Sequence, residues 1–162
     1  MKSVVGIYQT HQDAVNAVSE LQKTGYPVKH VSLLAKADLV DDHITVKSSD
    51  TPEKTEMSIG VVAGTVLGVL TGVGILAIPG LGFLFGAGAL VGAFAGFDLG
   101  IIGGGLAAIL TSLGMNEILS ARYEKHLNEG KFLVFVQGSE EELDKAQHIL
   151  HTSGLHMELD RN

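Results

Sequence analysis

Hydrophobic positions near the N-terminus change from a strand period to a helix period and back. Residues 4–8, Val-Val-Gly-Ile-Tyr, form a short apolar run that predicts a strand. Thr10 then stands as a helix N-cap, and apolar residues recur with helical spacing until Gly25, a typical helix stop. That apolar stripe consists of Ala14, Val15, Ala17, Val18 and Leu21. Residues 30–35, His-Val-Ser-Leu-Leu-Ala, predict a second strand.

The C-terminal part of the chain opens with a predicted helix. Residues 116–128 have helical spacing, and Gly130 follows them as a stop. Residues 131–136, Lys-Phe-Leu-Val-Phe-Val, then give the clearest strand pattern in the chain.

A second helix and a last strand complete this part. Ser139 and Glu142 have the spacing of a capping box, in which each side chain binds the other residue's backbone N–H. The apolar stripe of the helix consists of Leu143, Ala146, Ile149 and Leu150. Gly154 ends the helix, and residues 155–159 alternate as a strand.

Each arm of the chain is thus a β-α-β unit too small to bury its own sheet. Residues 44–46 predict a short third strand in the first arm, and residues 48–57 read as a polar linker. Two β-α-β units of this size form a ferredoxin-like sandwich when they pair. We therefore expect an α+β fold, with residues 1–57 and 116–162 as two halves of one split ferredoxin-like domain. Residues 58–115 would be an insertion between them.

The insertion is rich in glycine at regular spacing. Of the 21 glycines, all but Gly6, Gly25, Gly130, Gly138 and Gly154 lie within residues 58–115. Four-residue spacing places glycines along one helix face, where backbones can approach closely. We expect this helix-packing role for Gly60, Gly64, Gly68, Gly72, Gly82, Gly86, Gly88, Gly92, Gly96, Gly100 and Gly104.

The apolar lengths within the insertion predict a helical hairpin. Residues 58–78 would span about 31 Å as a helix, which matches the hydrocarbon core of a bilayer. Pro79 and Gly80 would form the turn, and residues 82–98 would return toward the entry surface. The apex carries no charge to anchor it in water. Both a hairpin embedded in a membrane and one enclosed by copies of the chain agree with this pattern.

Asp98 is the single charged residue of the insertion. An acid in an apolar helical region is a functional candidate by default. Asp98 would be an intramembrane or interfacial acid, which either lines an ion path in an oligomer or caps a helix that begins at Leu99. Its position near the hairpin exit favours the capping or interfacial role.

Charge and composition exclude several classes of function. The chain has a formal net charge of −7 and no basic patch, so we expect no nucleic-acid partner. It has no cysteine, which excludes disulfides and thiolate chemistry. The N-terminus has no signal-peptide pattern, so we expect both polar arms to lie in the cytoplasm.

Enzymatic and metal motifs are weak. His148, His151 and His156 have spacings at which imidazoles can share a metal, but they also fit a solvent-facing surface. Gly86-Ala87-Gly88 follows no predicted strand and lacks the third glycine of a dinucleotide motif. No serine sits in a nucleophile elbow. We therefore expect no enzyme activity and no cofactor.

Several runs resemble one bacterial family. These runs are residues 77–82, Ala-Ile-Pro-Gly-Leu-Gly, the glycine-rich residues 96–105, Leu-Gly-Met at 113–115 with Glu117, Tyr123-Glu124, and residues 130–134. Together they resemble the general-stress and low-temperature-induced glycine-zipper proteins. The resemblance covers most of the chain, and it implies a stress-associated bacterial membrane protein with no established enzymatic activity.

The leading hypothesis is therefore a self-assembling structural protein that oligomerises through its glycine-zipper helices in a lipid bilayer. It would lie in the cytoplasmic membrane with both arms in the cytoplasm. The alternatives are a large cytoplasmic homo-oligomer with a protein-enclosed helical core, a ligand-sensing module, and a channel with Asp98 in the pore.

Overall fold

The structure of the protein is a computed structural model that describes residues 2–36, 39, 73–78, 82–88, 90 and 105–162. Its strands are β1 (Ser3–Tyr8), β2 (Val31–Lys36), β3 (Val73–Ile78), β4 (Gly82–Gly88), β5 (Phe132–Gln137) and β6 (Glu158–Arg161). Its helices are α1 (His11–Lys23), α3 (Gly105–Ser112), α4 (Glu117–Asn128) and α5 (Glu140–Ser153), with the 3₁₀ helix η1 (Val28–His30). The expected α+β class is confirmed.

The described strands form one sheet in the order β3-β4-β2-β5-β1-β6, and every neighbouring pair is antiparallel. Strands from the two ends of the chain alternate in this sheet, because β5 lies between β1 and β2. Backbone hydrogen bonds join Ser3 and Asn162 in both directions, so the two ends of the chain lie side by side.

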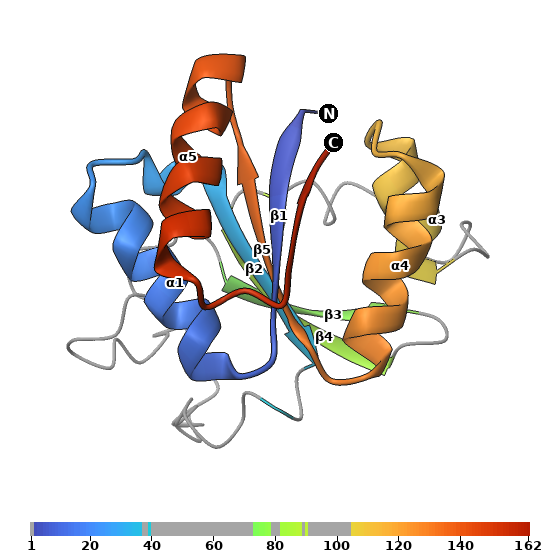
Figure 1. The fold of residues 1–162 in the computed structure, drawn as a ribbon. Helices are drawn as coiled ribbons and strands as arrows, with labels where there is room; N and C mark the ends of the chain where they lie inside the picture. The colour runs from blue at the N-terminus through green and yellow to red at the C-terminus, as the bar shows by residue number, and fades with distance from the viewer. Residues whose placement is uncertain (1, 37–38, 40–72, 79–81, 89, 91–104) are drawn as a thin grey trace, which may run out of the picture.

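Helices cover both faces of the sheet (Figure 1). On one face, α1 and α5 bury a core that includes Val4, Leu21, Val134 and Leu143. On the other, α3 and α4 bury a second core with members from four strands. All six residues of β1 are buried, as expected for a central strand with a helix layer on each side.

Local sequence signals in the two arms are confirmed. The Thr10 hydroxyl accepts a hydrogen bond from the Asp13 backbone N–H at the start of α1. Ser139 and Glu142 form the complete capping box of α5, and Gly154 ends that helix in the left-handed conformation. Asn116 is the N-cap of α4 and accepts from the backbone N–H groups of Ile118 and Leu119.

The last strand is displaced from its expected position. We expected it over residues 155–159, but β6 spans Glu158–Arg161. Its first pair is Glu158 with Ile7, one residue before β1 ends at Tyr8. The strand's position is therefore set by its distant partner and not by the local alternation of Leu155, Met157 and Leu159.

The helical hairpin expected over residues 58–98 is wrong where the structure describes it. Residues 73–78 and 82–88 form β3 and β4, which pair with each other in register from Val73 with Ala87 to Ile78 with Gly82. A four-residue spacing places residues on one face of a strand as well as of a helix, because four is a multiple of the strand period. The spacing of Gly82 and Gly86 therefore could not separate the two structures.

The other part of the insertion that the structure describes is helical. Residues 105–112 form α3, which a turn at Gly114 separates from α4. None of the helices in the described ranges is long and apolar enough to cross a membrane. The expected strand at 44–46, the linker at 48–57, the turn residues Pro79 and Gly80, and Asp98 lie outside the described residues.

Candidate functional site

The two glycine-rich segments of the insertion join the described fold at one corner of the sheet. Val73 begins β3 directly after residues 58–72, and it pairs with Ala87 near the end of β4. Gly88 ends β4 shortly before residues 91–104. Antiparallel pairing thus holds the two attachment points side by side. We call Ser32, Val73, Gly88 and Leu90 the glycine corner.

Gly88 permits a backbone contact that no other residue would allow. Its φ is +106°, and a Cβ at this position would lie 2.1 Å from the carbonyl oxygen of Val31. Real Cβ atoms do not approach backbone atoms so closely, so any side chain here would push β4 away from β2. Gly88 therefore allows β4 to lie close to β2. The helix-packing role that we expected for Gly88 is wrong, because the residue lies in a strand.

Ser32 fixes the chain just beyond β4. Its buried hydroxyl accepts a hydrogen bond of 3.0 Å from the backbone N–H of Leu90. The Leu90 side chain is 1% exposed and belongs to the core beneath α3 and α4. A buried backbone donor without a partner would cost about 1–3 kcal/mol, so the Ser32 hydroxyl stabilises this exit from the sheet.

The second glycine-rich segment is held at its other end by Glu124 of α4. The Glu124 carboxylate accepts a hydrogen bond of 2.6 Å from the Ala107 backbone N–H in the first turn of α3. A carboxylate at this position also interacts favourably with the positive end of the helix dipole. Both ends of residues 91–104 therefore attach to fixed points on the same side of the sheet.

A cluster of charged side chains joins α4 to β6. Arg122 Nη1 lies 3.2 Å from Glu158 Oε2, and Nη2 lies 2.8 Å from Asp160 Oδ2. His126 Nε2 lies 3.4 Å from the other Glu158 oxygen, and His126 Nδ1 lies 3.7 Å from Glu129 Oε2. The two partly exposed Arg122 pairs are worth at most about 1 kcal/mol each. We call this set the α4–β6 charge cluster, and its geometry suits attachment of a helix to an edge strand.

One buried phenol on each face of the sheet is held neutral, Tyr123 in the core beneath α3 and α4 and Tyr8 in the core beneath α1 and α5. Burial raises the pKa of Tyr123 above the usual range, and the nearby Asp160 carboxylate raises it further. Burial raises the pKa of Tyr8 in the same way, with a smaller contribution from Asp13. Neither phenol is placed to act as an acid near neutral pH.

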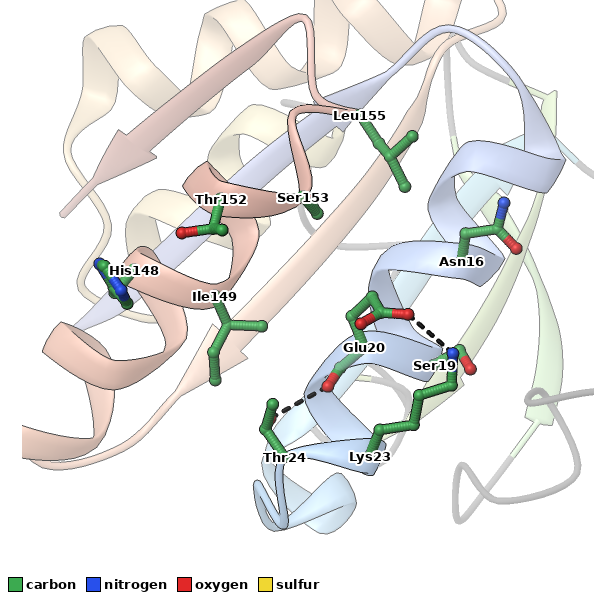
Figure 2. A pocket seen from close by; sticks show the side chains of 10 residues that line it. All are labelled: Asn16, Ser19, Glu20, Lys23, Thr24, His148, Ile149, Thr152, Ser153 and Leu155. Carbon is green, nitrogen blue, oxygen red and sulfur yellow. Dashed lines mark hydrogen bonds and ion pairs between the residues drawn. The ribbon is translucent and has the colours of Figure 1, made fainter.

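A hollow of about 540 Å³ lies between α1 and α5 (Figure 2). We call it the α1–α5 groove; it is lined by Asn16, Ser19, Glu20, Lys23, Thr24, His148, Ile149, Thr152, Ser153 and Leu155. Its two charged residues pair with each other, since Lys23 Nζ lies 2.8 Å from Glu20 Oε1. The groove thus presents neutral polar groups and little net charge to a ligand.

The three candidate metal-binding histidines do not converge on one point. His148 lines the α1–α5 groove, whereas the rings of His151 and His156 lie 5.9 Å apart. His156 Nδ1 is 3.1 Å from the Leu150 carbonyl oxygen, to which it donates in the tautomer with a hydrogen on Nδ1. Within the described residues, no three His, Cys, Asp or Glu side chains are placed to hold a metal ion.

The structure brings together only part of the expected glycine ladder. Gly82, Gly86 and Gly88 lie in β4, where Gly86 pairs with Leu34 of β2 and with Gly74 of β3. The remaining members, Gly60, Gly64, Gly68, Gly72, Gly92, Gly96, Gly100 and Gly104, lie outside the described residues.

Sequence reasoning missed Ser32, Leu90 and Glu124. Pro79-Gly80 marks a turn between two apolar segments, but the segments are long enough for helices, so the sequence did not indicate β3 and β4. No local signal exists for the Ser32 and Glu124 contacts, whose partners lie 58 and 17 residues away.

Comparison with known proteins adds no relative. No protein-family model, no curated protein and no solved structure matches the chain.

Proposed function

We propose that the protein is a non-enzymatic structural protein that assembles with copies of itself through its two glycine-rich segments. The observation that carries this proposal is the glycine corner, where Val73 pairs with Ala87. Residues 58–72 and 91–104 are both uncharged apart from Asp98, and both attach to the fold beside this pair. A rigid sheet that presents two glycine-rich apolar segments together favours their close packing, within one copy or between copies.

Strand order supports a finer description of the supporting domain. The strands β2-β5-β1-β6 are neighbours in that order, and they come from the units β1-α1-β2 and β5-α5-β6. We propose that these two units form the split ferredoxin-like sandwich. The inserted residues would then extend its sheet by β3 and β4. The second face of the sheet would be covered by α3 of the insertion together with α4 of the C-terminal half.

The surroundings that we propose for the glycine-rich segments are a lipid bilayer of the cytoplasmic membrane. Their uncharged composition supports this, as does the resemblance to stress-associated glycine-zipper membrane proteins. The two β-α-β units would remain in the cytoplasm. In the alternative arrangement, copies of the chain enclose these segments in a large soluble particle.

Paired substitutions in one glycine-rich segment test the assembly. Gly64→Leu with Gly68→Leu would fill the face that close packing needs, so we expect the assembly to dissociate in sedimentation experiments. Val62→Leu with Val66→Leu is the matched control, because it adds bulk at the same spacing outside the ladder. An unchanged particle mass in the glycine variant would overturn the proposal.

Flotation of cell lysates with lipid vesicles, followed by alkaline carbonate extraction, tests the surroundings. A protein that floats and resists extraction supports the bilayer. A protein that sediments as a large particle without detergent contradicts the bilayer and supports the protein-enclosed assembly.

A further inference from the structure

The two edges of the sheet differ in charge. One edge is β6, in which Glu158, Asp160 and Arg161 are charged. The other edge is β3, Val-Gly-Ile-Leu-Ala-Ile, which carries no charge along its six residues. Natural proteins commonly protect an edge strand with charge, because its free backbone groups otherwise pair with another strand. Only β6 has this protection.

Pairing of β6 with the same strand of a second copy would oppose like charges. When a two-fold axis runs perpendicular to the sheet, opposed residues share a face and must be an even number of positions apart. For the four residues of β6, only two registers of this kind bring three residues of one copy opposite three residues of the other. One places Glu158 opposite Asp160 of the second copy, and the other places Asp160 opposite its own equivalent. Each opposes two acids.

The same symmetry opposes no charges at β3. Every two-fold register of residues 73–78 pairs uncharged residues only. β3 is held along its full length by β4 on one side, from Val73 with Ala87 to Ile78 with Gly82. Among the strands that the structure describes, none pairs with its other side. Pairing with β4 therefore holds β3 in the extended conformation that addition of another strand requires.

We propose that β3 pairs antiparallel with β3 of a second copy, which joins two six-stranded sheets into one. This inference deepens the proposed self-assembly and rests on it, but it uses a different surface. In an antiparallel pair, the Val73 end of one strand meets the Ile78 end of the other. The two glycine corners thus lie at opposite ends of the shared strand pair, and each remains open to a further copy.

Because self-association uses two separate surfaces, loss of each contact leaves a particle of a different mass. Loss of the β3 contact alone leaves copies joined through the glycine-rich segments, and loss of the glycine contact alone leaves dimers joined through β3. Loss of both leaves monomers. Failure of one contact can therefore be recognised without failure of the other.

Cysteine cross-linking in the full chain tests the β3 pair directly. The chain has no cysteine, so a single introduced thiol can form a disulfide only with another copy. Single cysteines at Gly74, Ile75, Leu76 and Ala77 are compared under mild oxidation. In a two-fold pair, the residue opposite itself has a Cα separation of about 4.5–5.5 Å, whereas flanking residues lie about 7–8 Å from their equivalents.

We expect disulfide dimers to peak at one of these positions and to fall to background at its two neighbours. Equal cross-linking at adjacent positions, or none at any position, would overturn the proposal. These variants change one side chain each, and circular dichroism of the reduced forms verifies that they fold.

A charge substitution supplies the second test. Leu76→Lys places one ammonium group of each copy on the shared edge, so we expect the β3 contact to be lost. The mass of the Gly64→Leu, Gly68→Leu background then falls by half, from dimer to monomer. Ile118→Lys is the matched control, because Ile118 is an apolar residue of α4 that is 78% exposed. An equal loss of mass in both lysine variants, or no loss with Leu76→Lys, would contradict the β3 pair.

Discussion

The Glu124 side chain of α4 accepts a hydrogen bond from the Ala107 backbone N–H of α3, with an oxygen-to-nitrogen distance of 2.6 Å. The residue before Gly105 in the sequence is Gly104, which has no side chain to cap α3, so a residue of the next helix supplies the acceptor. The contact joins the two helices that cover the second face of the sheet.

Removal of this carboxylate is expected to destabilise α3. Glu124→Ala should lower the free energy of unfolding by about 1–2 kcal/mol, because the Ala107 N–H loses its acceptor and the helix dipole its anion. Glu124→Gln keeps a carbonyl acceptor and should lose less. Urea unfolding followed by circular dichroism measures both variants. The control is Lys125→Ala, whose exposed side chain is 3.9 Å from Glu129; an equal effect there would contradict a specific cap.

Replacement of Gly6 by a larger residue is expected to destabilise the protein while Tyr8 is present. A Cβ at Gly6 would lie 2.6 Å from the Tyr8 hydroxyl oxygen and 2.7 Å from a ring carbon. Gly6→Ala should therefore cost about 1–3 kcal/mol through overpacking. In a Tyr8→Leu background the same substitution should cost less, which a double-mutant cycle measures. Strict additivity would show that Tyr8 is not the cause.

The capping box of α5 gives a local test of stability. The Ser139 hydroxyl accepts from the Glu142 backbone N–H, and the Glu142 carboxylate accepts from the Ser139 N–H. Ser139→Ala should lower the free energy of unfolding by about 1 kcal/mol, and Ser139→Asp should retain most of it. Thermal unfolding of the three proteins decides this. Equal loss in the alanine and aspartate variants would argue against a capping role.

Alkaline pH is expected to unfold the protein through its tyrosines. Burial, with the nearby Glu142 carboxylate, raises the pKa of Tyr26 to about 12. Because the folded pKa lies above the unfolded value near 10, the stabilisation is full below pH 10 and is lost as pH rises toward 12. Tyr8 and Tyr123 are shifted in the same direction. The contribution of the tyrosines to stability should therefore be nearly constant from neutral pH to about 10 and then fall steeply.

Tyrosinate absorbance measures this directly, since the chain has no tryptophan to interfere. Ionisation should coincide with unfolding above pH 10. Tyr26→Phe should make the fall less steep, although it also removes the hydrogen bond from Tyr26 to the Gln137 carbonyl oxygen. Ionisation of all three phenols near pH 10 in a folded protein would contradict the expectation.

Residues whose signals act within a few positions could be read from the sequence. Thr10, Ser139 and Gly154 begin or end helices through contacts within one turn, and their roles follow from residue type and spacing. The antiparallel sheet and its helices follow from the periods of the two arms. The His148, His151 and His156 spacing, by contrast, carried no information about a shared site.

Residues 73–88 could not be read in this way. Glycine at every fourth position fits one face of a helix and one face of a strand equally well. The choice depends on β2, whose Leu34 and Ser32 pair with Gly86 and Gly88. A contact between positions so distant leaves no periodic trace in either segment, and the same holds for the start of β6.

The interleaved strand order also determines when each strand can pair during synthesis of the chain. β1 pairs only with β5 and β6 among the described strands, so it has no neighbour until the ribosome has made residues 132–137. At about 5–20 residues per second, the roughly 100 residues after β2 take about 5–20 s to translate. During that interval β1 and β2 lack β5, the strand that lies between them, while the glycine-rich segments are synthesised. A chain that stopped before Phe132 would keep β1 without either neighbour.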